Sequence, residues 1–335
     1  MMRLPRFALR VPRTVEEALE AKRAAPPDAA YVAGGTDLWP NMKRRHQEPS
    51  EVIALHAVGE LRGIAERDDG GMDLGATATL DAIARDPRVR ERYPAVAATM
   101  RVISTPILQN MGTIGGNLLL DTRCTYYDQN WEWRKSIDFC MKKDGTICWV
   151  APASPRCWAV QSADSVPLLI AMGATLDLTG PDGDRTVPVA ALYADDGILY
   201  LRKQRDELLT RIHLPAPNGW RATYRKVRRR GAFDFPVLGV GAWASFEPDG
   251  SVRDVRVVLG GVGSAPFEVE AAGEALKGGR LDDAERVEAV ADAAKKLGRP
   301  LDNTDFTLSW RKDMIRPTVK RALADLAIPA GAAGS

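Results

Sequence analysis

The sequence predicts an α+β fold built from more than one domain, and three observations support this. The chain has 335 residues, which exceeds one ordinary domain. Strand and helix patterns alternate along its first two thirds. From Tyr224 onward, strand patterns come first and helix patterns follow, which is typical of a separate α+β unit. The segment Pro215–Gly219 is the best candidate for a linker between the two parts.

Composition excludes several classes of protein. Hydrophobic residues make up 45% and charged residues 27%, the proportions of a folded globular protein. The 46 Lys and Arg nearly balance the 44 Asp and Glu, which argues against nucleic-acid binding. No apolar run is long enough to span a membrane, and the first 13 residues lack the apolar core of a secretion signal. We therefore expect a cytoplasmic protein without nucleic-acid or membrane partners.

The predicted elements of the first part follow from short local signals. Thr14 and Glu17 form a capping box that begins a helix through Ala25, and Thr79 is placed to cap a second helix. The expected strands and helices are, in order, strand 7–11, helix 15–25, strands 30–32 and 52–55, a helical turn at 60–64, strand 73–75, and helices 80–85 and 95–102.

The later elements are expected on the same grounds. Pro248–Gly250 is a hairpin signal between two strand patterns. The expected elements are a helix and strand within 166–178, strands 198–202, 207–214, 237–246 and 252–260, and helices 268–276, 282–297 and 310–326. The tail Pro329–Ser335 is expected to be frayed.

Two glycine-rich segments, Gly34–Asp37 and Gly112–Asn117, each place a threonine beside the glycines. Glycine lets a backbone approach a ligand closely, so such segments can direct N–H groups at phosphate oxygens. Neither segment matches G-x-G-x-x-G, and no G-K-[ST] occurs, which disfavours a Rossmann unit and a P-loop. Plain tight turns are the alternative. Two such segments are able to hold one pyrophosphate between subdomains.

All four cysteines lie in one 34-residue window, at Cys124, Cys140, Cys148 and Cys157. Without a secretion signal, disulfides are not expected in a reducing compartment. Four thiolates in one loop suit an all-thiolate metal site, either zinc or an iron–sulfur cluster. The spacing C-x15-C-x7-C-x8-C lacks the C-x2-C pairs common in structural zinc sites. Zinc, an iron–sulfur cluster and unligated thiols all remain open on spacing alone.

The same window holds three of the eight tryptophans, with a fourth, Trp158, directly after it, together with basic residues such as Lys142 and Lys143. An aromatic loop of this kind can shield a cluster from water and dock a partner. The alternative is a small separate hydrophobic core under a long loop. The three histidines, His46, His56 and His213, are scattered without ligand spacing, and no Ser–His–Asp set is apparent. We expect no catalytic residue in this chain.

Motifs along nearly the whole chain resemble the FAD-binding subunits of the xanthine oxidase and CO dehydrogenase family of molybdenum hydroxylases. The motifs are Ala33–Leu38, Gly112–Asn117, Ala163–Asp164, Glu207–Leu209, Tyr224–Lys226, Gly260–Gly263, Trp310–Arg311 and Arg321–Leu323. The resemblance implies a PCMH-type FAD-binding domain of two subdomains, at 1–57 and 58–218. A smaller α+β domain of the CO dehydrogenase flavoprotein C-terminal type would follow at 219–330.

This chain departs from ordinary family members after its second glycine segment. It inserts roughly 40 residues, at about 120–160, and all four cysteines lie inside the insertion. The insertion resembles that of the β subunits of 4-hydroxybenzoyl-CoA reductases, whose extra loop holds a [4Fe–4S] cluster. The resemblance implies that the four cysteines ligate such a cluster.

The resemblance also implies which residues bind FAD. The two glycine segments would surround the pyrophosphate and ribityl chain, Asp164 and Leu209 would lie beside the flavin or its tail, and Lys226 would approach the isoalloxazine. A cation there would stabilise the anionic reduced ring. The alternative for Lys226 is a solvated place in the basic run Arg225–Arg230. The implied set is Val32, Ala33, Gly34, Gly35, Thr36, Asp37, Leu38, Thr113, Gly115, Gly116, Asn117, Asp164, Leu209 and Lys226.

The function implied by the resemblance is electron transfer. A ferredoxin would reduce the cluster, which would pass electrons through FAD to the [2Fe–2S] clusters of a small subunit and to molybdenum on a large subunit. These chains would assemble as a dimer of heterotrimers and reductively dehydroxylate 4-hydroxybenzoyl-CoA. Two alternatives are an FAD subunit of a related hydroxylase that oxidises another aromatic or heterocyclic substrate, and a zinc-containing scaffold without FAD.

Overall fold

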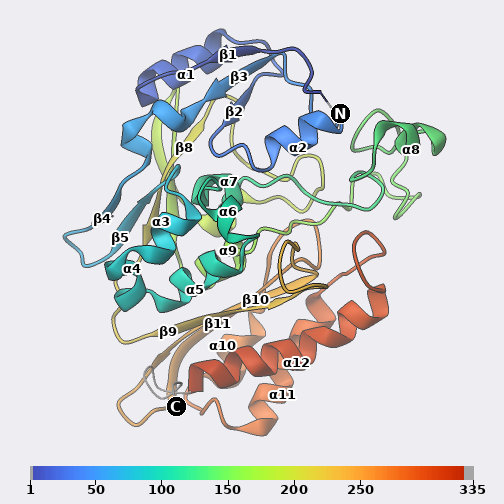
Figure 1. Ribbon diagram of the computed structural model, residues 1–335. Coiled ribbons are helices and arrows are strands. Elements are labelled where there is room, and N and C mark those ends of the chain that lie inside the picture. The colour runs from blue at the N-terminus through green and yellow to red at the C-terminus, as the bar shows by residue number, and fades with distance from the viewer. Residues whose placement is uncertain (1–2, 328–335) are drawn as a thin grey trace.

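The computed structural model describes residues 3–327, so the predicted tail Pro329–Ser335 lies outside the described residues. Three sheets form the framework, and helices cover them (Figure 1). Within the described part of the chain, no helix is long and apolar enough to cross a membrane.

The N-terminal sheet is parallel, with the strand order β1-β3-β2. Its strands are β1 (Ala8–Arg10), β2 (Ala30–Val32) and β3 (Glu51–Ala54). Helix α1 (Val15–Ala24) connects β1 to β2, and Thr14 caps it by accepting the N–H of Glu17, as the sequence predicts. The central strand β3 is buried along its whole length, as expected for a parallel strand covered on both faces. Helix α2 (Leu38–Lys43) begins directly after the first glycine segment.

The second sheet is antiparallel, with the order β4-β5-β8-β6-β7. Its strands are β4 (Ile64–Glu66), β5 (Met72–Gly75), β6 (Thr175–Gly180), β7 (Gly183–Pro188) and β8 (Leu208–Leu214). Short helices and this sheet share the largest hydrophobic core. They are α3 (Leu80–Arg85), α4 (Pro87–Arg92), α5 (Pro94–Val102), α6 (Pro106–Gln109), α7 (Ile114–Leu118) and α9 (Ser165–Ala171). Three of them begin at proline, which suits the first turn because that N–H has no helical acceptor.

The C-terminal part packs helices on one face of an antiparallel sheet ordered β12-β11-β10-β9 (Figure 1). The strands are β9 (Arg221–Val227), β10 (Leu238–Phe246), β11 (Val252–Gly260) and β12 (Phe267–Glu268). The helices are α10 (Ala271–Leu276), α11 (Ala284–Leu297) and α12 (Leu308–Ala327). The predicted hairpin is present, with Gly250 at φ 83° in the turn. Strands followed by helices confirm the expected α+β class.

Some local expectations differ from the structure. Residues 198–202 were expected to form a strand, but only an isolated bridge joins Tyr193 to Leu201 there. The second glycine segment is not a turn: Thr113 caps α7 by accepting the N–H of Gly116 at 3.0 Å. The predicted helical turn at 60–64 is a 3-10 helix at Gly59–Leu61, and β4 begins at Ile64. Two further 3-10 helices span Leu55–Ala57 and Val189–Leu192.

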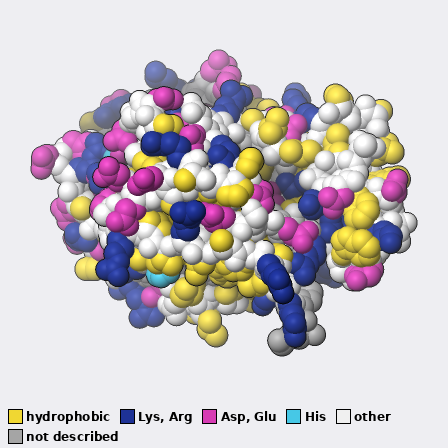
Figure 2. Space-filling model, turned by 90° about the horizontal axis from the view of Figure 1, so that it is seen from above, with side chains coloured by type: hydrophobic (Ala, Val, Ile, Leu, Met, Phe, Trp, Pro, Cys, Tyr) yellow, Lys and Arg dark blue, Asp and Glu magenta, His cyan; other side chains and the backbone are white. Residues whose placement is uncertain are grey.

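The cysteine insertion projects beside the N-terminal sheet as long loops with one short helix, α8 (Trp131–Ser136) (Figure 1). Four of its large apolar side chains are exposed: Trp131, Trp133, Ile147 and Trp149. Figure 2 shows hydrophobic side chains gathered at the right-hand end of the molecule, the end at which α8 lies in Figure 1. The insertion therefore presents an aromatic surface to its surroundings.

Candidate functional site

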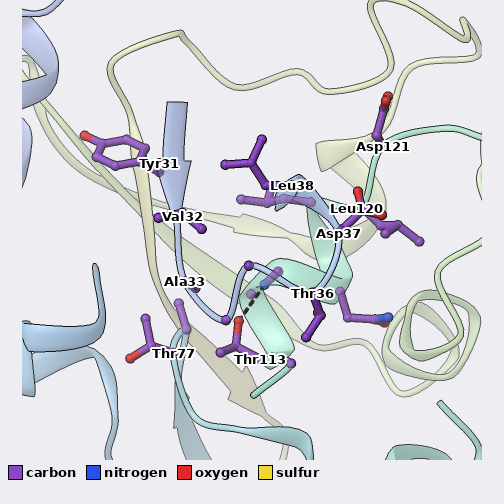
Figure 3. Close-up of a pocket in the computed structure, with 18 of the residues that line it drawn as sticks. Tyr31, Val32, Ala33, Thr36, Asp37, Leu38, Thr77, Thr113, Leu120 and Asp121 are labelled. Carbon is purple, nitrogen blue, oxygen red and sulfur yellow. Dashed lines mark hydrogen bonds between the residues drawn. The ribbon is translucent and has the colours of Figure 1, made fainter. Parts of the chain in front are cut away.

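A cavity of about 320 Å³ opens where the N-terminal sheet, α7 and the loops before β8 meet. Both glycine segments lie on its wall (Figure 3). Every residue expected to bind FAD lines this cavity except Lys226. The fold thus brings together segments that are far apart in the sequence. Their contact with FAD itself stays a prediction.

The first glycine segment has the geometry of an anion-binding loop. Gly35 adopts φ 71°, and a Cβ built on Gly34 would lie 1.8 Å from the carbonyl oxygen of Met111. Glycine is required at both positions, because a side chain would be strained at one and would overlap backbone at the other. The N–H groups of residues 34–37 make no hydrogen bond within the described part of the chain. They are free to receive phosphate oxygens.

The second glycine segment contributes differently. The N–H groups of Ile114 and Gly115 bind the carbonyls of Ala78 and Ala76, at 3.1 and 2.9 Å, and that of Gly116 binds the Thr113 hydroxyl. These donors are occupied, so the segment does not offer them to phosphate. A Cβ on Gly116 would meet only the Thr113 oxygen. The absence of side chains here leaves the cavity wide enough for a bulky ligand.

Asn117 and Asp164 connect α7 to α9 at the cavity wall. The Asn117 Oδ1 accepts hydrogen bonds from the Ser165 N–H at 3.2 Å and from its hydroxyl at 2.6 Å. Asp164 accepts from the hydroxyl of Tyr224 at 2.8 Å and from the ammonium of Lys226 at 2.9 Å. Burial raises the pKa of Asp164, and the Lys226 ammonium and the Tyr224 hydroxyl oppose that rise.

Lys226 lies behind Asp164 rather than on the cavity wall. Its ammonium also donates to the Val102 carbonyl at 3.0 Å, so it joins β9 to the end of α5. The side chains of Lys226 and Asp164 are 3% and 4% exposed, which contradicts the solvated alternative considered for Lys226. In this structure its charge reaches the cavity only through Asp164.

This pair gives a stability prediction. Lys226→Met would leave a buried carboxylate without its cation, so we expect a loss of about 3–5 kcal/mol in the free energy of unfolding. The double variant Lys226→Met/Asp164→Asn should recover most of the loss. Urea unfolding at saturating FAD measures both.

The matched control is Arg225→Met on the same strand, because the Arg225–Asp325 pair is largely exposed, at 47% and 27%. Its loss should cost less than about 1 kcal/mol. Equal costs for Lys226→Met and Arg225→Met would contradict the structural importance of the buried pair.

Several residues of the cavity wall were not predicted. They are Tyr31, Thr77, Ser104, Leu120, Asp121, Tyr200, Lys203, Phe233 and Phe235, among others. They come from separate loops and strand ends, and no local motif marks them. Tyr31, Leu120 and Asp121 appear with the glycine segments in Figure 3. Lys203 and the two phenylalanines add a cation and two apolar rings to the wall.

The four cysteines are all buried, between 4% and 7% exposed, and none forms a disulfide. Cys124, Cys140 and Cys157 share one apolar cluster with Tyr127. Among residues 3–327, no three His, Cys, Asp or Glu side chains converge closely enough to hold a single metal ion. The structure therefore supports neither the zinc alternative nor the predicted cluster, and metal binding by these cysteines stays a prediction.

The thiol environment is apolar, with N–H groups directed at sulfur. Burial raises the pKa of Cys124 to about 12 and that of Cys157 to about 11. The Ala159 N–H donates to the Cys157 Sγ at 3.4 Å. Such thiols become thiolates only beside a compensating positive charge, which a metal centre supplies. Low exposure and N–H···S contacts fit an iron–sulfur cluster.

Strained backbone surrounds Cys140. Asp138 and Phe139, which precede it, both adopt φ 59°, and Asp144 adopts φ 69°. Non-glycine residues in this region cost of order 1–2 kcal/mol each and gather at functional sites. The loop then folds back, with the N–H groups of Lys143 and Gly145 donating to the Cys140 carbonyl at 2.9 and 3.1 Å. The backbone around Cys140 is thus a tight and locally strained loop.

The insertion is fastened to the cavity at its start. The buried Arg123 guanidinium binds Asp37 of the first glycine segment and donates to Asn41 of α2 at 3.3 Å. Arg134, fully buried, donates to the carbonyl of Arg45 at 3.1 Å. Arg123 therefore joins the insertion to the cavity wall, and Arg134 joins it to the loop after α2.

Known protein families match the two parts of the chain. Residues 5–217 match the family described as the FAD binding domain in molybdopterin dehydrogenase. Residues 222–326 match the CO dehydrogenase flavoprotein C-terminal domain.

Individual relatives cover almost the whole chain. It is 31% identical to the aldehyde oxidoreductase FAD-binding subunit PaoB of Escherichia coli K12, over 94% of this chain and 97% of that one. It is 28% identical to the carbon monoxide dehydrogenase medium chain of Hydrogenophaga pseudoflava, over 95% and 96%. A solved structure of carbon monoxide dehydrogenase from Hydrogenophaga pseudoflava superposes with a TM-score of 0.81, covering 97% of this chain and 98% of that one. The chain belongs to the FAD-binding medium subunits of the xanthine oxidase and CO dehydrogenase family of molybdenum hydroxylases, and it is an FAD-binding oxidoreductase subunit.

Proposed function

We propose that this chain is the electron-transfer subunit of a molybdenum hydroxylase and carries both FAD and a [4Fe–4S] cluster. The observation that supports the cluster is the set of four buried cysteines in an insertion fastened to the wall of the FAD cavity. Cys124, Cys140, Cys148 and Cys157 are its proposed ligands. Flavin exchanges electrons singly or in pairs, so it can join one-electron clusters to a two-electron reaction.

Different groups of residues would bind different parts of FAD. The free N–H groups of residues 34–37 would receive the FAD pyrophosphate, while Gly115 and Gly116 leave room beside it. Asp164, fixed by Tyr224 and Lys226, and the rings of Phe233 and Phe235 line the same cavity. The remaining predicted residues, Val32, Ala33, Leu38, Thr113, Asn117 and Leu209, complete this proposed contact set.

The organic substrate would react on another chain. The named relatives include a FAD-binding subunit and a medium chain, which supports a complex with a large molybdenum subunit and a small [2Fe–2S] subunit. The predicted dimer of heterotrimers and the cytoplasmic location stay predictions. The exposed tryptophans of the insertion offer a docking surface for an external redox protein, such as the predicted ferredoxin.

The direction of electron flow separates two candidate reactions. The relatives named above are an aldehyde oxidoreductase and a carbon monoxide dehydrogenase, which favours substrate oxidation with electrons leaving through FAD and the cluster. The four-cysteine insertion, which resembles that of 4-hydroxybenzoyl-CoA reductases, supports the reverse flow for reductive dehydroxylation. Both candidates use the same cofactors in this chain.

Anaerobic purification of the whole complex with its native partners tests the proposal. We expect FAD, iron and acid-labile sulfide in this chain, and reduction of an artificial acceptor by an aldehyde or an N-heterocycle. Reduction of 4-hydroxybenzoyl-CoA by a low-potential donor, without oxidation of the other substrates, would instead establish the reductive reaction. A complex without flavin would contradict both.

A further inference from the structure

A buried ion pair, Lys142–Asp121, lies between the cysteine region and the FAD cavity. The ammonium of Lys142 is 2.8 Å from the Asp121 Oδ1, and both side chains are 7% exposed. All three N–H donors of the Lys142 ammonium are engaged, because it also binds the Thr122 hydroxyl at 2.8 Å and the Gly197 carbonyl at 2.7 Å. An ion pair this buried costs desolvation, so its place in the fold calls for a reason beyond stability.

The two charges differ in their relation to the cavity. Asp121 lines the FAD cavity, beside Leu120 in Figure 3, whereas Lys142 does not line it. Lys142 lies two residues after Cys140 and stacks over Tyr127, a member of the cysteine cluster, at 4.9 Å. Asp121 also reaches Tyr127, whose hydroxyl donates to its Oδ2 at 3.0 Å. Of the two charges, Asp121 lines the cavity and Lys142 binds Gly197, which lies against Cys157.

Contacts of Lys142 link it both to the cysteine region and to the cavity wall. The Gly197 N–H donates to the Cys157 carbonyl at 2.9 Å, and a Cβ on Gly197 would lie 2.6 Å from the Cys157 sulfur. The same Gly197 carbonyl accepts from Lys142. On the other side, the ammonium lies 5.4 Å from the ring centre of Tyr200, which lines the cavity. Only one peptide unit and one aromatic ring separate Lys142 from the two sites.

We propose that the Lys142–Asp121 pair is an oriented charge pair that biases a shared electron toward the cysteine-bound cluster and away from the flavin. This inference rests on the proposed function, since it assumes that both cofactors are present. In the step concerned, one electron would pass from the reduced flavin to the oxidised cluster, and the pair itself would form or break no bond. An added electron makes either centre more negative. The nearby ammonium stabilises that charge on the cluster, and the carboxylate disfavours it at the cavity.

The charge pair would influence the direction in which electrons move between the flavin and the cluster. It favours movement from flavin to cluster, which is the direction needed when a substrate is oxidised and electrons leave through the insertion. Lys142 and Asp121 are positioning residues in this account, because they act on the centres through charge and take no part in the chemistry.

The test is an anaerobic redox titration of the whole complex. Its readout is the ratio of reduced cluster, from its electron paramagnetic resonance signal, to reduced flavin, from its absorbance. In Lys142→Gln/Asp121→Asn, both charges are removed while polar side chains of similar size remain. We expect the ratio to move at least about tenfold toward the flavin, which is about 59 mV for a one-electron couple. Lys142→Arg, which keeps the charge, should stay close to the wild type.

The matched control is Lys143→Gln, the next residue, whose ammonium is partly exposed and paired with Asp144 at 3.2 Å. Solvent screens that charge, so the ratio should not move. Should the double variant not fold, Asp121→Asn alone serves, because Lys142 keeps Thr122 and Gly197 as acceptors. Its ratio should move in the same direction.

The outcomes separate the two proposals. An unchanged ratio in a variant that retains iron and FAD would overturn the charge pair alone, even if its melting temperature fell. A shift equal to that of Lys143→Gln would do the same. A wild-type complex that lacks iron would instead overturn the proposed function.

Discussion

Cys140→Ser is expected to remove the iron–sulfur cluster from this chain and to leave FAD bound. Cys140 is buried, and a serine oxygen in its place would be a poor iron ligand, because these clusters are held by soft thiolates. The cysteines do not line the FAD cavity, which explains why flavin should remain. Iron, acid-labile sulfide and FAD are measured in the same anaerobic preparation.

The matched control for this variant is Met141→Leu. Met141 is the adjacent residue and packs against the cysteine cluster, but its thioether is not a proposed ligand. The volume is nearly conserved, so iron and FAD should both stay at wild-type levels. Full iron content in Cys140→Ser would refute ligation by this residue, and joint loss of iron and flavin would refute the independence of the two sites.

Gly116→Val is expected to weaken FAD binding at least about tenfold, or by about 1.4 kcal/mol. Gly116 lines the cavity, and a Cβ there would meet only the Thr113 oxygen, at 3.0 Å. The branched side chain would therefore extend into the space beside the first glycine segment, where the pyrophosphate is expected. Flavin absorbance per protein after dialysis, followed by titration with FAD, measures the effect.

Gly59→Val is the control for the glycine variant, because a Cβ at Gly59 has no heavy atom within 4 Å and Gly59 does not line the cavity. It should retain FAD at the wild-type level. Normal FAD affinity in a folded Gly116→Val protein would show that the cofactor does not pass this segment.

Helices and hairpins that carry a cap or turn motif in their own residues were predictable from the sequence. The Thr14 and Thr79 caps mark the starts of α1 and α3, and Pro248–Gly250 marks the hairpin between β10 and β11. The helix over the second glycine segment was not predicted, because glycine is a poor helix former. This helix is held by tertiary contacts, since α7 bonds to the carbonyls of Ala76 and Ala78.

Only those residues of the candidate site that belong to sequence motifs were predictable. The two glycine segments lie together because Gly34 meets the backbone of Met111, although no local pattern announces that contact. Asp121 and Tyr200 come from loops without any motif, and only the fold brings them to the cavity. The family resemblance implied that Lys226 lies beside the flavin, yet its burial against Asp164 depends on the packing of β9 against α9.

The central claim is that the four cysteines hold one iron–sulfur cluster in the subunit that binds FAD. Iron, acid-labile sulfide and FAD in the anaerobically purified wild-type subunit, together with its electron paramagnetic resonance spectrum after reduction, test this most directly. The account predicts about four iron and four sulfide per FAD and a spectrum typical of a reduced [4Fe–4S] cluster. Stoichiometric FAD in a subunit with no iron, or with a single zinc ion, would contradict it.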